Sequence, residues 1–282
     1  GMVEKKGMGK AVGHAVLWFG IAIVLFPLYI ALVATSHTYD VLIGSTPLWF
    51  GGEFIKNFTT VLTEGLKASG GIPVWVMMAN SLVMALGIAI GKIAISITAA
   101  YAIVYFRFPG RELCFVLIFI TLMMPVEVRI VPTFQVAANL NFIDSYMGLV
   151  LPLIASATAT FLYRQMFMTI PAELLEAARI DGAGPWRFFV DVVLPLSRTN
   201  TAALFVVLFI YGWNQYLWPL LVTNQENMYT IVMGIQRMVN IPDAVPEWNL
   251  IMAVALLGML PPLLVVLGMQ KLFVRGLVET EK

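Results

Sequence analysis

The sequence has few charged residues and almost no cysteine. Charged residues make up 12% of its 282 residues and hydrophobic residues 60%, whereas charged residues usually form about a quarter of a soluble domain. A soluble globular domain is therefore excluded, and the composition is that of an integral membrane protein. The one cysteine, Cys114, excludes a disulfide within the chain and disfavours a metal site built on thiolates.

Long basic runs and histidine clusters are also missing. The formal net charge is +1, so we expect no nucleic-acid partner. The two histidines, His14 and His37, lie near opposite ends of the first apolar run. A membrane-embedded enzyme with Glu127 and Lys92 as acid and base lacks a nucleophile at recognisable spacing. We therefore predict that the chain is not an enzyme by itself and binds neither a metal nor a catalytic cofactor.

Apolar runs occupy most of the chain. Each is near or above the ~20 residues that a helix needs to cross about 30 Å of hydrocarbon, which predicts an all-α membrane protein with six transmembrane helices. The first run exceeds the roughly 7–15 apolar residues of a signal peptide, so we expect an uncleaved anchor. The runs cover residues 15–35, 76–105, 113–135, 146–168, 200–222 and 248–270.

The distribution of lysine and arginine predicts the orientation, because these residues collect in cytoplasmic loops. With a cytoplasmic N-terminus, most of them lie on the cytoplasmic side and only Lys56, Lys67 and Arg237 lie outside. Both termini are therefore predicted to be cytoplasmic. Nothing indicates a separate soluble domain, so we expect a cytoplasmic segment 1–14 followed by a single membrane domain, 15–282.

Residues 169–198 are the longest stretch in the middle of the chain that is not lipid-soluble, and they lie between two apolar runs. We expect a helix from about 170 to 181, ended by Gly182 in the left-handed conformation. Pro185 would open a second short helix that ends at Pro195. The stretch would either dock in a groove of another protein or lie on lipid headgroups. The residues assigned to docking are Glu173, Glu176, Ala177, Ala178, Asp181, Gly182, Trp186 and Phe188.

A spaced motif runs through this stretch. Glu176-Ala177-Ala178 is followed after three residues by Gly182, and after nine more by Val-Val-Leu-Pro at 192–195. This pattern resembles the EAA loop of ABC-importer permeases, although Val192 replaces the usual isoleucine. Residues 176–183 are similar to the sugar-importer, MalG-like branch of that family. The resemblance implies that 169–195, between the fourth and fifth transmembrane helices, forms coupling helices that transmit ATP-driven closure to the membrane domain.

The same resemblance implies a multi-pass protein of the bacterial inner membrane with several partners. These are a second permease subunit, an ATPase dimer that holds ATP and magnesium, and an extracytoplasmic substrate-binding protein, besides the lipid bilayer. We expect no nucleotide site in this chain. Gly87 to Lys92 superficially resembles a phosphate-binding loop, but it has three residues between the glycines rather than four. Gly87 and Gly91 instead predict a helix-packing face.

Lys92 falls near the middle of the second predicted span, and Glu127 and Arg129 lie within the third. A charge at the bilayer centre costs about 2.5–3.5 kcal/mol on insertion scales, so we expect all three to face the protein interior. In one alternative, Glu127 neutralises Lys92 or Arg129 and the ion pair holds the helix bundle together. In the other, the surplus positive charge lines a pathway for an anion. In the second case Arg129 would hold a phosphate with its planar fork, and Lys92 would act as a point charge.

Amides and aromatic rings meet at membrane depth on the fifth apolar run. The amides would form hydrogen bonds with the hydroxyl groups of a polyol, and an aromatic ring would form an apolar wall of the site. Interhelical hydrogen bonding together with an aromatic belt is the alternative. The residues assigned to the pathway here are Trp213, Asn214, Gln215 and Tyr216.

Residues 122–133, together with 91–93 and 157–165, resemble the sn-glycerol-3-phosphate permeases of the ABC-importer family. The resemblance implies transport of glycerol-3-phosphate or glycerophosphodiesters. A permease for a neutral sugar or polyol is one alternative. An ion-coupled secondary transporter, in which Glu127 binds the ion, is another.

Overall fold

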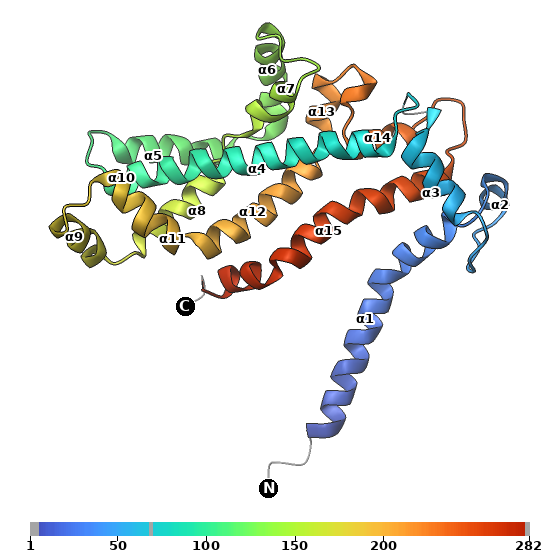
Figure 1. Cartoon of the computed structure of the whole chain (residues 1–282), viewed down its shortest axis with the longest axis horizontal. Helices are drawn as coiled ribbons and strands as arrows, with labels where there is room; N and C mark the ends of the chain where they lie inside the picture. The colour runs from blue at the N-terminus through green and yellow to red at the C-terminus, as the bar shows by residue number, and fades with distance from the viewer. Residues whose placement is uncertain (1–5, 68–69, 280–282) are drawn as a thin grey trace. The chain divides into compact units, whose positions relative to one another are not determined.

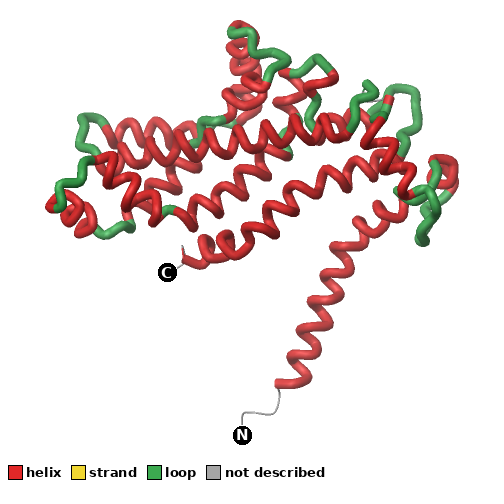
Figure 2. Tube along the Cα trace, viewed as in Figure 1, coloured by secondary structure: helices red, strands yellow, loops and turns green. Residues whose placement is uncertain are grey.

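The computed structural model describes residues 6–67 and 70–279, and in these ranges the chain consists of helices and loops without a strand. Figure 2 shows the helices in red and the loops in green. The predicted all-α class is confirmed for the described residues. Residues 1–5 of the predicted N-terminal segment 1–14 lie outside them.

Three helices in the described ranges are long and apolar enough to cross a membrane: Gly9–Ala34, Val74–Tyr105 and Trp248–Leu272. There are up to six spans if each of three bent helix pairs counts as one. This agrees with the six spans predicted from the apolar runs. The chain is therefore an all-α membrane protein.

The chain divides into two compact units. The first combines the described residues up to Trp75 with Ile235–Met259, and the second combines Val76–Gly234 with the described residues from Leu260. All the residues assigned to docking or to the pathway lie in the second unit.

The first unit is held together by a buried asparagine. The Nδ2 group of Asn57 donates to the carbonyl oxygens of Thr35 and His37, both at 2.9 Å. Its Oδ1 accepts from Nδ2 of Asn249 at 3.2 Å. Because a buried amide without partners would be costly, these bonds fix three helices to one another. The helices of this unit are α1 (Lys6–Ala34), α2 (Tyr39–Gly44), α3 (Phe54–Thr63) and the first part of α15 (Trp248–Glu279).

The second unit is built on α4 (Val74–Tyr105), which has no internal proline and runs without a break. The other helices are α5 (Arg111–Ile120), α6 (Val126–Asn139), α7 (Tyr146–Val150), α8 (Ala157–Met168), α9 (Ala172–Ile180), α10 (Pro185–Phe188), α11 (Leu194–Leu196), α12 (Arg198–Trp213), α13 (Leu217–Val222) and α14 (Ile231–Val239), which continues into the first unit. Short turns η2 (Thr121–Met123), η3 (Leu151–Leu153), η4 (Phe189–Val193) and η5 (Glu226–Met228) lie between them.

Apolar side chains of α4 form a core with α6, α7 and α13. Met84 of α4, Leu149 of α7 and Trp218 of α13 are buried in one cluster. The indole of Trp218 donates a hydrogen bond of 2.9 Å to the carbonyl of Gly148. These contacts position the middle of α4 against α6, α7 and α13.

Proline breaks helices that the apolar runs predicted to be continuous. The predicted span 113–135 is two helices, because α5 with η2 meets α6 at 105°. Pro125 lacks an N–H and keeps Met124 in extended backbone, so α5 cannot continue into α6. The predicted span 146–168 bends by 48°. The fifth helix ends at Trp213 rather than near 222, and residues 214–216 are not helical.

The packing face predicted at Gly87 and Gly91 is confirmed. A Cβ atom on Gly87 would lie 2.9 Å from the side chain of Val150, and one on Gly91 would lie 2.6 Å from that of Ile154. Both distances are shorter than real Cβ contacts, so the segment 150–154 approaches α4 where side chains are missing. Because 87–92 lies within α4, it is not a phosphate-binding loop.

Gly91→Leu is expected to lower the thermal unfolding midpoint of the detergent-solubilised protein. The added side chain would push Ile154 away from α4, and overpacking of this kind costs about 1–3 kcal/mol. Gly268→Leu in α15 is the matched control, because a Cβ there meets nothing within 4 Å. Size-exclusion profiles recorded after heating give both midpoints. Equal midpoints for the two variants would contradict the close contact.

Candidate functional site

The docking segment, defined as residues 169–195, lies at the end of α4 that carries Tyr105 (Figure 1). Its first helix, α9, covers Ala172–Ile180, close to the predicted range. Gly182 has φ +76°, the left-handed conformation predicted for it, which glycine adopts without a steric cost. The second helix, α10, begins at Pro185 as predicted.

The second helix does not end at Pro195, and the prediction of a stop there is wrong. A π-helical turn covers Phe189–Val193, and α11 continues through Pro195 to Leu196. In a regular α-helix the proline ring would clash with a carbonyl of the preceding turn, and the wider π turn relieves that clash. The helix ends at Ser197, whose hydroxyl donates to the carbonyl of Val193 at 2.6 Å.

Aromatic side chains attach the docking segment to α4. The hydroxyl of Tyr101 donates a hydrogen bond of 2.6 Å to the carbonyl of Pro185, and its ring centroid lies 4.8 Å from that of Phe189. The ring of Tyr105 meets Phe188 edge-on at 5.2 Å. Phe188 is only 2% exposed. It was assigned to docking, but the structure places it inside the fold, where it holds the segment in position.

The other side of the docking segment is exposed. The most exposed of its large apolar side chains are Ile180 and Trp186, the latter 74% exposed. Exposed apolar side chains beside carboxylates without a partner are typical of a surface that binds another protein. Of the remaining residues assigned to docking, Glu173, Glu176, Ala177, Asp181 and Gly182 are exposed and Ala178 is half-buried. In the described part of the chain none of these carboxylates forms a salt bridge.

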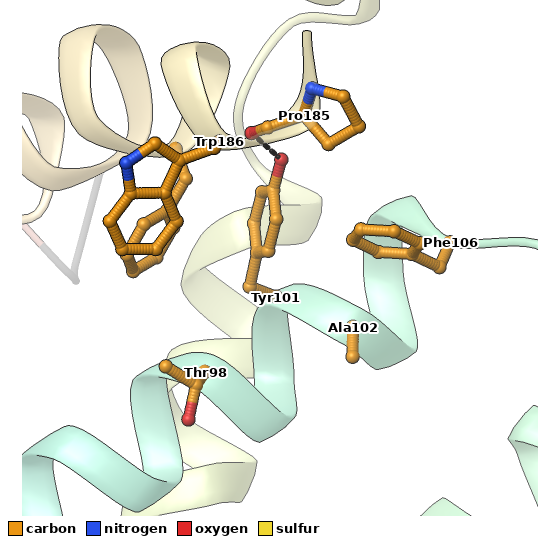
Figure 3. A pocket seen from close by; sticks show the side chains of 7 residues that line it. Thr98, Tyr101, Ala102, Phe106, Pro185 and Trp186 are labelled. Atoms are coloured by element: carbon orange, nitrogen blue, oxygen red, sulfur yellow. Dashed lines mark hydrogen bonds between the residues drawn. The ribbon is translucent and has the colours of Figure 1, made fainter.

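Tyr101 lines two surface cavities, and Figure 3 shows the residues that line the first of them. One has a volume of about 320 Å³ and is lined by Phe106 of the chain after α4 and by Pro185 and Trp186 of the docking segment. The other has a volume of about 360 Å³ and is lined by Arg179, among others. The docking segment and α4 therefore pack through a buried cluster of aromatic and aliphatic side chains, and these cavities lie at its surface.

Among the three charges assigned to the pathway, only Lys92 is buried, with 7% of it exposed. Its Nζ atom lies 3.9 Å from the centroid of the Tyr211 ring, a cation–π contact. Glu127 and Arg129 are exposed, so the prediction that all three face the interior of this chain is wrong. The reason is the bend at Pro125, which directs α6 away from α5 and leaves the first turns of α6 on the surface.

No salt bridge joins these groups in the described ranges. The alternative in which Glu127 neutralises Lys92 or Arg129 is therefore not seen. Arg129 lies close enough to Lys92 for the charge of one to act on the other. Two neighbouring cations without a carboxylate partner create a local positive potential that attracts an anion.

The helix break after α12, at residues 214–216, lies beside Tyr211. Nε2 of Gln215 donates to the carbonyl of Tyr211 at 3.2 Å, and Asn214 and Tyr216 are exposed. Trp213, by contrast, is 2% exposed and stacks on Phe209 with a centroid distance of 6.0 Å. Trp213 therefore packs within the bundle and does not form an exposed wall.

Sequence reasoning missed two tyrosines. Tyr211 was read only as part of an aromatic run, although it precedes Gln215 by one helical turn and could have been placed beside it. Tyr101 lies near the end of an apolar run, where aromatic residues are common in any membrane protein. Nothing in the sequence alone pairs Tyr101 with Pro185, because the two residues are distant along the chain.

The chain matches known proteins over its whole length. It is 53% identical over 282 residues to the sn-glycerol-3-phosphate transport system permease protein UgpE of Rhizobium meliloti, and 54% identical to that of Agrobacterium fabrum, with 100% of each chain covered. The UgpE protein of Salmonella typhimurium is 54% identical over 283 residues, again with full coverage.

The fold matches a solved transporter. The crystal structure of a bacterial ABC transporter involved in the import of the acidic polysaccharide alginate contains a chain that superimposes with a TM-score of 0.80. The match covers 96% of this chain and 98% of that chain, at 18% sequence identity. At this identity the likeness establishes the fold only.

A family model described as "Binding-protein-dependent transport system inner membrane component" matches residues 92–279. This range covers more than half of the chain, and the full-length relatives are transport permeases. The protein therefore belongs to the family of inner-membrane components of binding-protein-dependent transport systems, and it is a multi-pass ABC permease rather than an enzyme.

Proposed function

We propose that this chain is a permease subunit of an ABC importer for sn-glycerol-3-phosphate or glycerophosphodiesters. The observation that carries the proposal is the 53–54% identity to UgpE permeases over the full chain. The charges of Lys92 and Arg129 support it, because a phosphate ester is an anion and these cations have no carboxylate partner in the described ranges. The chain would form half of the translocation pathway.

The partners follow from this proposal. A second permease completes the pathway, an extracytoplasmic binding protein delivers the substrate, and an ATPase dimer binds the exposed face of the docking segment. ATP and magnesium belong to the ATPase, and this chain binds no cofactor. Both termini are cytoplasmic, which places the docking segment and most of the lysine and arginine residues on the cytoplasmic side.

The residues of the pathway have separate roles. The guanidinium of Arg129 contacts two phosphate oxygens with its fork, and Lys92, held over Tyr211, supplies a fixed positive charge. Asn214 and Gln215 lie at a break in the helix, and such breaks occur at membrane depth only where they are buried in protein or line a cavity. Their amides bond the glycerol hydroxyls.

The substrate proposal is tested with the purified importer in proteoliposomes. Binding protein loaded with glycerol-3-phosphate is expected to stimulate both ATP hydrolysis and uptake of the substrate. The same binding protein mixed with maltose is expected to stimulate neither. Equal stimulation by maltose would identify a permease for neutral sugars. Uptake that follows an ion gradient without ATP would identify a secondary transporter, in which Glu127 binds the ion.

Arg129→Gln is expected to lower glycerol-3-phosphate uptake by at least about tenfold, because a hydrogen bond to a charged group contributes about 1.5–3 kcal/mol. The yield of folded complex should stay unchanged, since Arg129 is exposed and makes no salt bridge in the described ranges. Lys271→Gln removes a positive charge outside the pathway and serves as the control. A parallel fall in yield and uptake would assign Arg129 a structural role.

Gly182→Ala is expected to lower ATP-driven uptake without changing membrane insertion. Alanine at φ +76° is strained by about 1–2 kcal/mol, so the turn between α9 and α10 would shift. Gly184→Ala is the matched control, because Gly184 lies two residues away with φ −72° and open space around it. Equal uptake by the two variants would show that the left-handed turn is not needed for docking.

A further inference from the structure

The unbroken helix α4 connects the docking segment with Lys92. It covers Val74–Tyr105 without an internal proline. Lys92 and Tyr101 lie on it about nine residues apart, or roughly 13.5 Å along the axis. Over this distance a regular helix behaves as a stiff rod, because each of its peptide groups is hydrogen-bonded to the next turn. A displacement at Tyr101 therefore reaches Lys92 without an intervening joint.

The covalent route out of the docking segment is different. On its C-terminal side the helix Pro185–Leu196 meets α12 at 72°. The helix axis is interrupted at this bend, so this route lacks the continuous hydrogen-bonded axis of α4. The stiff route through α4 has no covalent link to the docking segment and depends on side-chain contact.

Tyr101 makes both a hydrogen bond and a ring contact with the docking segment. Its hydroxyl donates to the Pro185 carbonyl at 2.6 Å, and its ring packs against Phe189 at a centroid distance of 4.8 Å. Figure 3 shows the hydroxyl directed at this carbonyl, with Trp186 on one side of the ring and Phe106 on the other. The other contacts between α4 and the docking segment are apolar packing within one buried cluster, which has no defined direction.

We propose that Tyr101 is a positioning residue that transmits movement of the docking segment to α4, and through α4 to Lys92. The proposal rests on the proposed function. Tyr101 contacts neither ATP nor substrate. Its ring alone could slide across Phe189, whereas a hydrogen bond has a defined distance and direction and ties one point of α10 to one point of α4.

Tyr105 is a natural control on the same helix. Its ring belongs to the same aromatic cluster, 5.1 Å from Tyr101 and 5.2 Å from Phe188. Its hydroxyl also donates to a backbone carbonyl, but that carbonyl belongs to Phe167 of α8, at 3.3 Å. Removing either hydroxyl leaves the rings in place, and of the two changes only that at Tyr101 removes a hydrogen bond to the docking segment.

The test uses the complete importer, with its ATPase and binding protein, in proteoliposomes. The quantity measured is the number of glycerol-3-phosphate molecules taken up per ATP hydrolysed, which does not depend on how much complex is recovered. Tyr101→Phe is expected to lower this ratio by about two- to tenfold, the change in an equilibrium that loss of one hydrogen bond produces. Tyr105→Phe is expected to keep the ratio of the unchanged protein, with a similar thermal midpoint.

Two outcomes would overturn the inference. One is an unchanged ratio in Tyr101→Phe. The other is an equal fall in both variants, which would mean that the hydroxyls only stabilise the aromatic cluster. Failure of the proposed function is separate, because it appears in the unchanged importer as uptake that does not require ATP or does not accept glycerol-3-phosphate.

Discussion

The structure depends on one constraint: backbone N–H and C=O groups have no water partners in hydrocarbon, so each segment at membrane depth must satisfy them itself. Helices do so, which explains why the described chain is helical and why α4 can cross without a break. Every departure from helix then has to be covered by protein or to line a cavity. The breaks at Pro125 and at residues 214–216 are two such departures, and they carry the residues that we assign to the proposed pathway.

The positive charge of the proposed pathway depends on that geometry. Lys92 stays buried because the ring of Tyr211 lies 3.9 Å from its Nζ atom and partly replaces its hydration. Arg129 lies beyond the bend, at the surface of this chain but near enough to repel Lys92. An anion between or beside two such cations relieves their repulsion, whereas a neutral sugar does not. The electrostatics thus agree with the identity to permeases for a phosphate ester.

The two sides of the docking segment differ: one packs against α4 and the other is exposed. Phe188 and Phe189 are buried against α4, so they determine where the segment sits. The exposed side carries Trp186 and carboxylates that have no salt-bridge partner in the described ranges. Because its buried side packs on its own subunit, the segment keeps an exposed side for the proposed contact with the ATPase.

The sequence by itself determined the class, the apolar spans and the turn at Gly182, because length, hydrophobicity and glycine's freedom at positive φ are local properties. The spacing of Gly87 and Gly91 was enough to predict a packing face for the same reason. Only the tertiary structure decided that Glu127 and Arg129 are exposed, that Trp213 and Phe188 are buried, and that Tyr101 bonds Pro185. These outcomes depend on the angle at which Pro125 turns the chain and on contacts between segments distant in sequence, and neither is encoded in a local pattern.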